Sequence, residues 1–287
     1  MFTLKQKICF PGSANAANED IACSGKNYCF VIDGASCLSG VNVMGGGSDA
    51  AWMVQKIAAA LGDLLQSDMQ TPTQVLLGRL VADLRKQYLQ ALEKQGITEP
   101  ADSPSAGIAL FRARQGKLEF FGLGDCVGVA QLPDGESFVS FDEQLINLDN
   151  GVLKQMYQLH KQTGVCVLQA RHLCNEQLIE NRAKRNRAGG YWILDLLTDD
   201  GLKNARQYSW PLTQPIRVGA YSDGFAELSE HFGIYRDAKA LFAAMQETDL
   251  NKMYAQLKQV QDNDPDCNAY PRFKLRDDTS ALWGVFE

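Results

Sequence analysis

The hydrophobic positions of the chain change their period along its length, and these changes predict the order of its elements. Residues 28–32 form a continuous apolar run rich in β-forming residues, which is typical of a buried strand. In 50–67, and again in 74–92, the apolar positions recur with helical spacing. Residues 106–130 return to strand periodicity, so a second β region follows the two helices.

The second half of the chain repeats this alternation. Residues 237–247 and 250–260 are amphipathic helices by their spacing, and 280–286 is a final apolar strand. Between them, 189–194 is predicted as a strand, and the mixed polar segment at about 141–188 as helical stretches. The order predicts an α+β fold, and we expect one domain over 1–287 with a variable polar segment at about 141–188.

Local signals set some of the predicted boundaries. Thr71-Pro72-Thr73-Gln74 has the pattern of a capping box with Pro at the first helical position, and Gly96 is placed to end that helix. Asp149-Asn150-Gly151 predicts a break within the polar segment. Gly45-Gly46-Gly47 lacks the Gly-Lys-Ser/Thr ending of a phosphate-binding loop, so it is interpreted as a linker.

Composition narrows the class of protein. At 45% hydrophobic and 22% charged residues, the chain of 287 residues can bury a sizeable core. Its net charge of −6 disfavours nucleic acid as a partner, and no segment is apolar enough to suggest a membrane span or a signal peptide. The 8 cysteines show no paired spacing of a zinc site and are typical of reduced core thiols. We therefore expect a cytoplasmic protein.

Acidic residues recur where predicted strands begin or end. One such residue beside a glycine is typical of a turn, but a sheet can bring several of them together. Carboxylates that meet repel one another unless they are protonated or bridged by cations, and Mg²⁺ or Mn²⁺ suits oxygen ligands. The segments in question are Asn18-Glu19-Asp20, Asp33-Gly34, Gly124-Asp125, Ser222-Asp223-Gly224 and Asp277-Asp278.

The order of these segments resembles that of the metal-dependent PPM/PP2C protein phosphatases, and most of all their divergent bacterial branch. The resemblance runs from about Gly12 to the C-terminus. It implies a four-layer α/β/β/α sandwich of two antiparallel sheets flanked by helix pairs. It also implies a Mg²⁺- or Mn²⁺-dependent protein serine/threonine phosphatase, in which water activated by two metal ions, or three, attacks phosphoserine or phosphothreonine. The expected partners are phosphorylated proteins, such as a Ser/Thr kinase or its targets.

The resemblance assigns the central roles to residues of the strand ends. Asp33 would bridge two metal ions, and the Gly34 carbonyl would add a ligand. Asp223 and Asp277 would hold the first of these ions, so Asp33 and Asp223 are the expected catalytic residues.

Other acids receive secondary roles from the same resemblance. Glu19 or Asp20 would serve the second metal ion, directly or through water. Asp125 and Glu227 match positions where the family can bind a third ion. Asp278 aligns with the family's usual Asn and is therefore ranked below its neighbour as a ligand.

Two departures from the family pattern leave a second function open. Asn15 stands where many members carry a phosphate-binding Arg, and Ala35 where the eukaryotic enzymes carry a His. A charge-assisted hydrogen bond contributes ~1.5–3 kcal/mol, so the missing Arg would weaken substrate binding without removing the metal chemistry. The alternative to an enzyme is a phosphatase-like module that binds or senses without turnover.

Other chemistries have weaker signals. The glycines of 122–127 miss the third glycine of a dinucleotide fingerprint, and no Gly-x-Ser-x-Gly surrounds Ser36. Neither Cys37 nor Cys126 is followed by the Cys-x₅-Arg loop of a cysteine phosphatase. The basic segment 171–187 fits either a solvated helix face or a docking surface for a phosphorylated, acidic partner.

Overall fold

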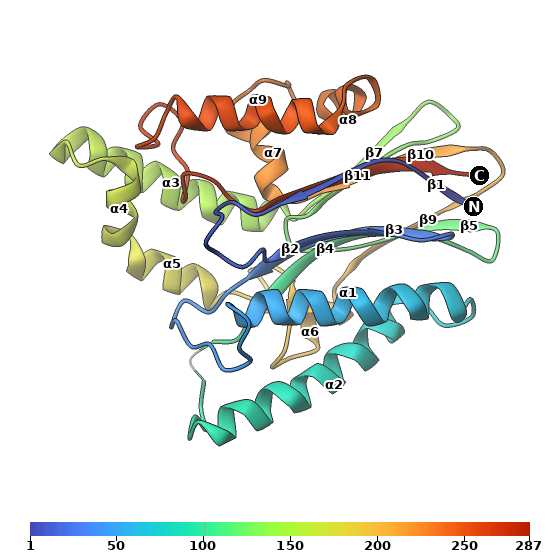
Figure 1. The fold of residues 1–287 in the computed structure, drawn as a ribbon, viewed down its shortest axis with the longest axis horizontal. Helices are drawn as coiled ribbons and strands as arrows, with labels where there is room; N and C mark the ends of the chain where they lie inside the picture. Colours follow the sequence, from blue (N-terminus) through green and yellow to red (C-terminus); the bar gives the residue numbers. More distant parts are fainter. Residues whose placement is uncertain (101) are drawn as a thin grey trace.

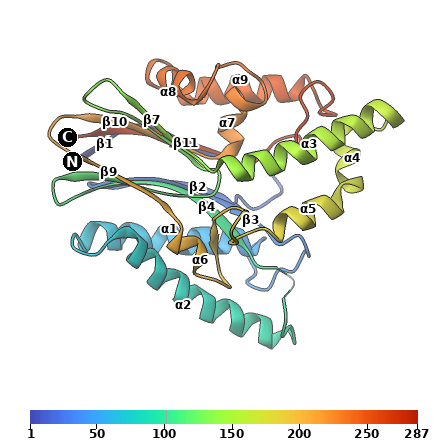
Figure 2. The ribbon, with the colours of Figure 1, turned by 180° about the vertical axis from the view of Figure 1, so that it is seen from behind.

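Two antiparallel β-sheets face each other in the computed structural model, which describes residues 1–100 and 102–287 (Figures 1 and 2). One sheet has the strand order β1-β11-β10-β6-β7, and the other β2-β3-β4-β5-β9 with the short β8 paired to β4. The strands are β1 (Phe2–Phe10), β2 (Asp20–Ser24), β3 (Tyr28–Ala35), β4 (Ser105–Arg114), β5 (Lys117–Leu123), β6 (Val127–Gln131), β7 (Ser137–Ser140), β8 (Leu194–Asp195), β9 (Arg206–Pro211), β10 (Ile216–Tyr221) and β11 (Thr279–Phe286).

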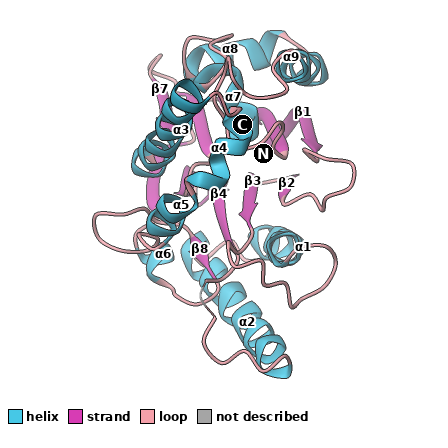
Figure 3. Cartoon of the chain, turned by 90° about the vertical axis from the view of Figure 1, so that its left-hand side faces the viewer, coloured by secondary structure: helices cyan, strands magenta, loops and turns pink. Residues whose placement is uncertain are grey.

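Helices cover both outer faces, so the predicted four-layer sandwich is confirmed (Figure 1). Helices α1 and α2 lie on the β3 side, and α7, α8 and α9 on the β11 side. Helices α3, α4 and α5 lie across one end of the sandwich, which Figure 3 views directly. The helices are α1 (Asp49–Ser67), α2 (Thr73–Lys94), α3 (Glu143–Thr163), α4 (Val167–Leu173), α5 (Asn175–Arg182), α6 (Asp200–Lys203), α7 (Asp223–Glu230), α8 (Ala238–Glu247) and α9 (Leu250–Asp262).

The central strands are buried on both faces, which explains their continuous apolar sequences. In β3, Phe30 and Ile32 pack against α1 and α2, whereas Cys29 and Val31 point into the layer between the two sheets. Alternate residues of a strand face opposite sides of the sheet, so both sets are apolar when both sides are covered. This burial fixes the register of β3, and with it the position of the acidic residue at its end.

The start of α2 differs from the prediction. The helix begins at Thr73 after Pro72, and no side chain caps its N-terminus. The N–H of Thr71 instead donates to Asp68 Oδ1 at 2.9 Å. In a capping box, the side chain of Gln74 would accept this N–H. Here the Asp68 carboxylate accepts it instead, and the predicted capping box does not form. The predicted end is confirmed, because Gly96 follows the helix with a φ of 73° and its N–H donates to the Glu93 carbonyl.

Two predictions in the middle of the chain are wrong. Helix α3 runs without a break through Asp149-Asn150-Gly151. Asp142 caps its N-terminus by accepting the N–H groups of Gln144 and Leu145. The long helix thus tolerates Gly151 in its interior, because burial of Leu153 and Met156 outweighs the local turn signal. Segment 189–194 is mostly irregular, and only Leu194 begins the short strand β8.

Strand β9 was not predicted, because Arg206, Gln207 and Pro211 leave no continuous apolar run at its position. Most of its residues are exposed or half-buried at the edge of the six-stranded sheet. Within residues 1–100 and 102–287, the 8 cysteines are free thiols, most of them buried. None of the helices in these ranges has the length and apolar character that a membrane crossing requires.

Arg112 on β4 links the sheet to the connection between α1 and α2. Its side chain is fully buried. The guanidinium donates to the backbone carbonyl oxygens of Thr71 at 2.9 Å, Leu65 at 3.2 Å and Asp68. Its donors thus bond to carbonyl groups at the end of α1 and in the connection to α2.

Replacing Arg112 with Met should therefore destabilise the protein. The carbonyl oxygens of Thr71 and Asp68 would lose this donor, whereas Leu65 keeps a hydrogen bond from Asn27 at 2.8 Å, and an unsatisfied buried acceptor costs about 1–3 kcal/mol. Urea unfolding of Arg112→Met should show this loss, whereas the control Arg79→Met, on the exposed face of α2, should unfold like the wild type. Equal midpoints for both variants would contradict the structural role of Arg112.

Candidate active site

The register of three strands places the first acids together. Asp20 on β2 lies directly opposite Asp33 on β3, and Asp33 lies opposite Gly107 on β4. The Gly34 N–H donates to the Glu19 carbonyl at 2.9 Å, which holds the N-terminal loop against the end of β3. These pairings bring Glu19, Asp20 and Asp33 to one end of the sandwich.

Asp125 reaches the same place from the turn between β5 and β6. A Cβ atom on Gly107 would lie 3.0 Å from Asp125 Oδ1, so the glycine opposite Asp33 leaves the space that this carboxylate occupies. Gly124 precedes it with a φ of 66°, which favours glycine, and thereby turns the chain between the two sheets. Asp125 thus lies beside Asp33 because of two glycines that the sequence alone does not connect.

Asp223 comes from the second sheet. It is the first residue of α7, directly after β10, where the positive end of the helix dipole stabilises a carboxylate. A Cβ atom on Gly224 would lie 2.1 Å from the Asp278 carbonyl oxygen, so only glycine allows α7 to begin this close to the loop before β11. The loop that carries Asp277 and Asp278 is therefore packed against the start of α7.

The two acids of that loop have different surroundings. The Asp278 carboxylate accepts the N–H groups of Gly12 at 2.7 Å and Glu19 at 2.6 Å, and so ties the N-terminal loop in place. Asp277 forms an ion pair with Lys274 at 2.7 Å and faces a cavity. Both oxygens of Asp278 are thus occupied by backbone donors, whereas Asp277 lies at the cavity wall, where its Oδ1 accepts from Lys274 and from the Asp278 N–H.

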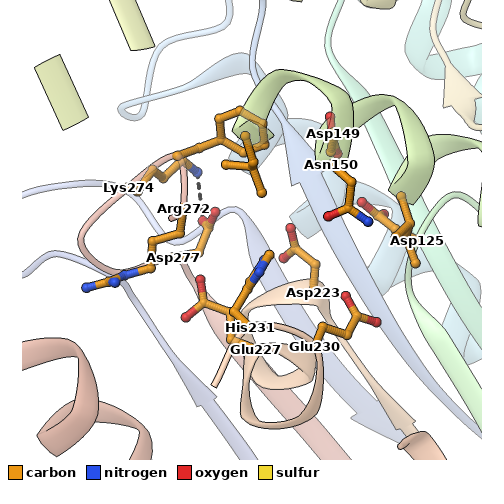
Figure 4. Close-up of a pocket in the computed structure, with 13 residues that line it drawn as sticks. Asp125, Asp149, Asn150, Asp223, Glu227, Glu230, His231, Arg272, Lys274 and Asp277 are labelled. Carbon is orange, nitrogen blue, oxygen red and sulfur yellow. Dashed lines mark hydrogen bonds and ion pairs between the residues drawn. The ribbon is translucent and has the colours of Figure 1, made fainter. Parts of the chain in front are cut away.

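Two adjacent cavities collect most of the predicted site residues. The larger, of about 390 Å³, is hereafter called the acidic cavity. The smaller, of about 60 Å³, adds Glu227 (Figure 4). Asp20 is buried beside Asp33, and Asp278 lines neither cavity. The predicted residues lining the acidic cavity are Glu19, Asp33, Gly34, Asp125, Asp223 and Asp277.

Several charged residues of the site were not predicted. Asp149 on α3 lines both cavities, and Glu230 on α7 lines the smaller one. Asp149 was predicted in a helix break, although it lies four residues before Leu153 on the buried side of α3. A continuous helix would have placed it toward the site. The basic residues of the acidic cavity are Arg171, Arg182 and Lys274.

Burial and mutual repulsion dominate the electrostatics of the site. Burial raises the pKa of Asp33 well above its ordinary value, and the nearby charges of Asp20, Asp223 and Asp125 raise it further. The pKa values of Asp20, Asp125 and Asp223 are also raised, and burial is the largest cause for each. The cluster therefore retains protons unless positive charge compensates it.

The acids around the smaller cavity titrate near neutral pH. Burial raises the pKa of Asp149 to about 7 and that of Glu230 to about 7, in both cases with a further contribution from Asp223. The pKa of Glu227 is raised to about 8, mainly by burial, although Gln261 donates to its carboxylate at 2.8 Å. These groups therefore gain or lose protons between about pH 7 and about pH 8 in the metal-free protein.

The chemistry of these residues suits a hard divalent cation. Both carboxylate oxygens of Asp20 are buried without a hydrogen-bond partner, and the converging donors are oxygen atoms, which Mg²⁺ and Mn²⁺ prefer. In the described part of the chain, no three candidate side chains converge closely enough to enclose an ion. The individual ligand assignments therefore stay predictions.

The cysteines of the site are poor nucleophiles. Burial raises the pKa of Cys37 to about 12, with a further increase from Asp102. The pKa of Cys126 is raised well above its ordinary value by burial and by Asp33. Both groups are thiols at neutral pH, whereas nucleophilic catalysis requires the thiolate. This agrees with the rejection of a cysteine mechanism from the sequence.

Comparisons with known proteins agree with the geometry. The family model described as "Protein phosphatase 2C" matches residues 14–260. The Mycobacterium tuberculosis serine/threonine phosphatase PstP/Ppp superposes with a TM-score of 0.58 at 15% identity, covering 100% of both chains. The catalytic domain of PstP in complex with 2 manganese ions gives 0.54 at 15%, again over 100% of both chains.

A third similar structure comes from another bacterium. PppA, described as a key regulatory component of T6SS in Pseudomonas aeruginosa, gives a TM-score of 0.56 at 13% identity, covering 99% of this chain and 96% of that one. At such low identity these structures establish the shared fold. The comparison with curated proteins gives no significant match.

The raised pKa values predict how the stability of the metal-free protein depends on pH. The pKa of Asp149 is about 7 in the folded protein, compared with its ordinary value of 3.8. The folded protein therefore binds this proton more tightly than the unfolded chain does. The contribution of Asp149 to stability is complete below about pH 4 and is lost as the pH rises through about 7. In EDTA, the melting temperature should therefore fall between pH 5 and pH 8.

Two variants separate this effect from the overall negative charge. Asp149→Asn removes one titrating group and should flatten the decrease, whereas Asp83→Asn, on the exposed face of α2, should keep the slope of the wild type. A metal-free melting temperature that rises over this pH range would show that the acids are not held as described.

Proposed function

The chain belongs to the protein phosphatase 2C family and is a phosphoprotein phosphatase, and on this premise we propose that it hydrolyses phosphoserine and phosphothreonine with two divalent metal ions bound in the acidic cavity. The observation that carries the proposal is the convergence of carboxylates from distant segments. Asp33, Asp125, Asp223 and Asp277 line one cavity although they lie far apart in the sequence.

Each part of the site contributes to this reaction in a different way. Bound Mg²⁺ or Mn²⁺ would lower the pKa of water to give hydroxide and would neutralise the phosphoryl oxygens. Asp33 and Asp223 would hold the ions from the two sheets, with Asp277 and the Gly34 carbonyl as further ligands. Asp20, whose oxygens have no hydrogen-bond partner, and Glu19 would serve the second ion. A third ion would lie near Asp125.

The remaining acids support this arrangement. Glu227 is the further candidate for the third ion, and Gln261 orients its carboxylate. Asp278 positions Glu19 through the backbone N–H of that residue. The manganese-bound PstP structure supports the choice of metal, because its chain has the same fold. The substrates we propose are phosphorylated proteins, such as a Ser/Thr kinase or its targets, in the cytoplasm, where free cysteines stay reduced.

The proposal predicts metal-dependent hydrolysis of p-nitrophenyl phosphate. Activity should require Mn²⁺ or Mg²⁺, disappear in EDTA and return when the metal is added again. Asp33→Asn should lower kcat/KM by at least about 100-fold, since each 1.4 kcal/mol of lost transition-state stabilisation corresponds to a factor of ten. Asp63→Asn, an exposed acid of α1, is the matched control and should keep full activity.

Two results would contradict the proposal. One is the absence of turnover with either metal and with phosphorylated proteins, and the other is full activity of Asp33→Asn.

A module that binds without turnover is the second candidate, and one observation favours it. Lys274 already neutralises Asp277, a predicted ligand of the first metal ion, through the ion pair of 2.7 Å. Calorimetric titration with Mn²⁺, combined with a phosphate-release assay on a phosphoprotein, separates the two functions. The module would bind metal and phosphoprotein but release no phosphate, whereas the enzyme would release phosphate in proportion to metal occupancy.

A further inference from the structure

Arg182 is the last residue of α5, and its side chain lies at the wall of the acidic cavity. Its Nη1 donates to the Ser105 hydroxyl oxygen at 3.2 Å, and its Nη2 donates to the Ser36 carbonyl oxygen at 3.4 Å. Both acceptors are neutral. The side chain is half-buried, so the guanidinium is positioned by contacts yet open to the cavity.

The strand register places these acceptors close to the predicted metal-binding residues. Ser105 on β4 lies opposite Ala35, and Gly107 on the same strand lies opposite Asp33. Two residues along a strand span about 6–7 Å, so Ser105, which Arg182 contacts, lies about that far along the strand from the position opposite Asp33. This separation leaves room for one phosphate group. The Ser36 hydroxyl donates to the Glu19 carboxylate, which joins Arg182 to the same group of residues.

The charge around the acidic cavity shows why this position matters. Carboxylates dominate its wall, and they repel the doubly negative phosphate of a phosphomonoester. Of its basic residues, Lys274 is paired with Asp277, Arg171 comes from α4, and Arg182 donates to Ser36 and Ser105 beside the end of β3. Within residues 1–100 and 102–287, Arg182 donates hydrogen bonds to one hydroxyl and one carbonyl oxygen, which leaves most of its five N–H donors available for an anion.

We propose that Arg182 binds the phosphate group of the substrate. This inference rests on the function proposed above, and it identifies a residue that holds the ester beside the predicted metal-binding carboxylates. A guanidinium presents parallel N–H donors that match two phosphate oxygens, and such charge-assisted pairs are stronger than neutral hydrogen bonds. Arg185, three residues after the end of α5, forms an ion pair with the buried Asp195 at 2.8 Å, which anchors the chain that follows Arg182.

Two substitutions and one control test this role. Arg182→Gln should raise the KM for p-nitrophenyl phosphate, and the inhibition constant of inorganic phosphate, by roughly 10–100-fold, the size of one lost charge-assisted hydrogen bond. The change in kcat should be smaller. Arg182→Lys keeps the charge and should recover part of the affinity. Arg187→Gln, an exposed arginine of the same basic segment, should match the wild type.

Chemical rescue separates phosphate binding from a merely structural role. Added guanidinium at millimolar concentration should restore part of the activity of Arg182→Gly, while the melting temperature of each variant shows that it is folded. A variant that is folded but unchanged in KM and in phosphate inhibition would overturn the proposal. So would an equal loss in Arg187→Gln, because the effect would then come from overall charge.

A binding measurement keeps this inference separate from the proposed function. If the wild type hydrolyses no ester, that function fails, and calorimetric titration of inorganic phosphate in the presence of Mg²⁺ then tests Arg182 by itself. Weaker phosphate binding by Arg182→Gln than by the wild type would support the inference. Equal binding by both proteins, or no binding by either, would overturn it.

Discussion

The repulsion among buried carboxylates at one end of the sandwich is the constraint on which the site depends. Asp20 and Asp33 lie directly opposite each other on the adjacent strands β2 and β3, and Asp125 and Asp223 add their charges from other segments. Burial alone disfavours each charge, and proximity multiplies this cost. Such a cluster is stable only with bound protons or with cations. The core fixes the strand register and thereby holds these carboxylates close together. Their repulsion favours the binding of cations, which a metal-dependent phosphatase requires.

The backbone around the cluster is fixed by contacts that leave little freedom. Asp278 holds the N-terminal loop through two N–H groups, and Gly224 lets the start of α7 lie against the same loop. Gly107 leaves room for the carboxylate of Asp125. Rigid placement of this kind is what a metal site requires, because carboxylates that could move apart would relieve their repulsion without binding an ion.

Helices α3 to α5 supply a different part of the site. They carry Asp149 and Arg182 to the cavity from a segment that is mostly polar. Their own small core and the Arg185–Asp195 ion pair attach them to the sandwich. The basic segment 171–187 is therefore neither a uniformly solvated helix face nor wholly a free docking surface, since Arg171 and Arg182 line the acidic cavity and Arg185 pairs with the buried Asp195. This helical part provides positive charge at the edge of an acidic centre.

The sequence by itself determined an α+β class, because the spacing of apolar residues in strands and helices is a local property of residue order, and the four-layer sandwich followed from the resemblance to a known family. It also predicted the acids at strand ends, such as Asp33 and Asp223, since a strand followed by an acid and a glycine is visible in one segment. Tertiary structure decided what depends on distant partners. It made α3 continuous and directed Asp149 and Arg182 into the cavity. It also engaged the Asp278 carboxylate in hydrogen bonds with backbone N–H groups. Those outcomes follow from packing and competing hydrogen bonds between segments far apart in the chain, which no local pattern records.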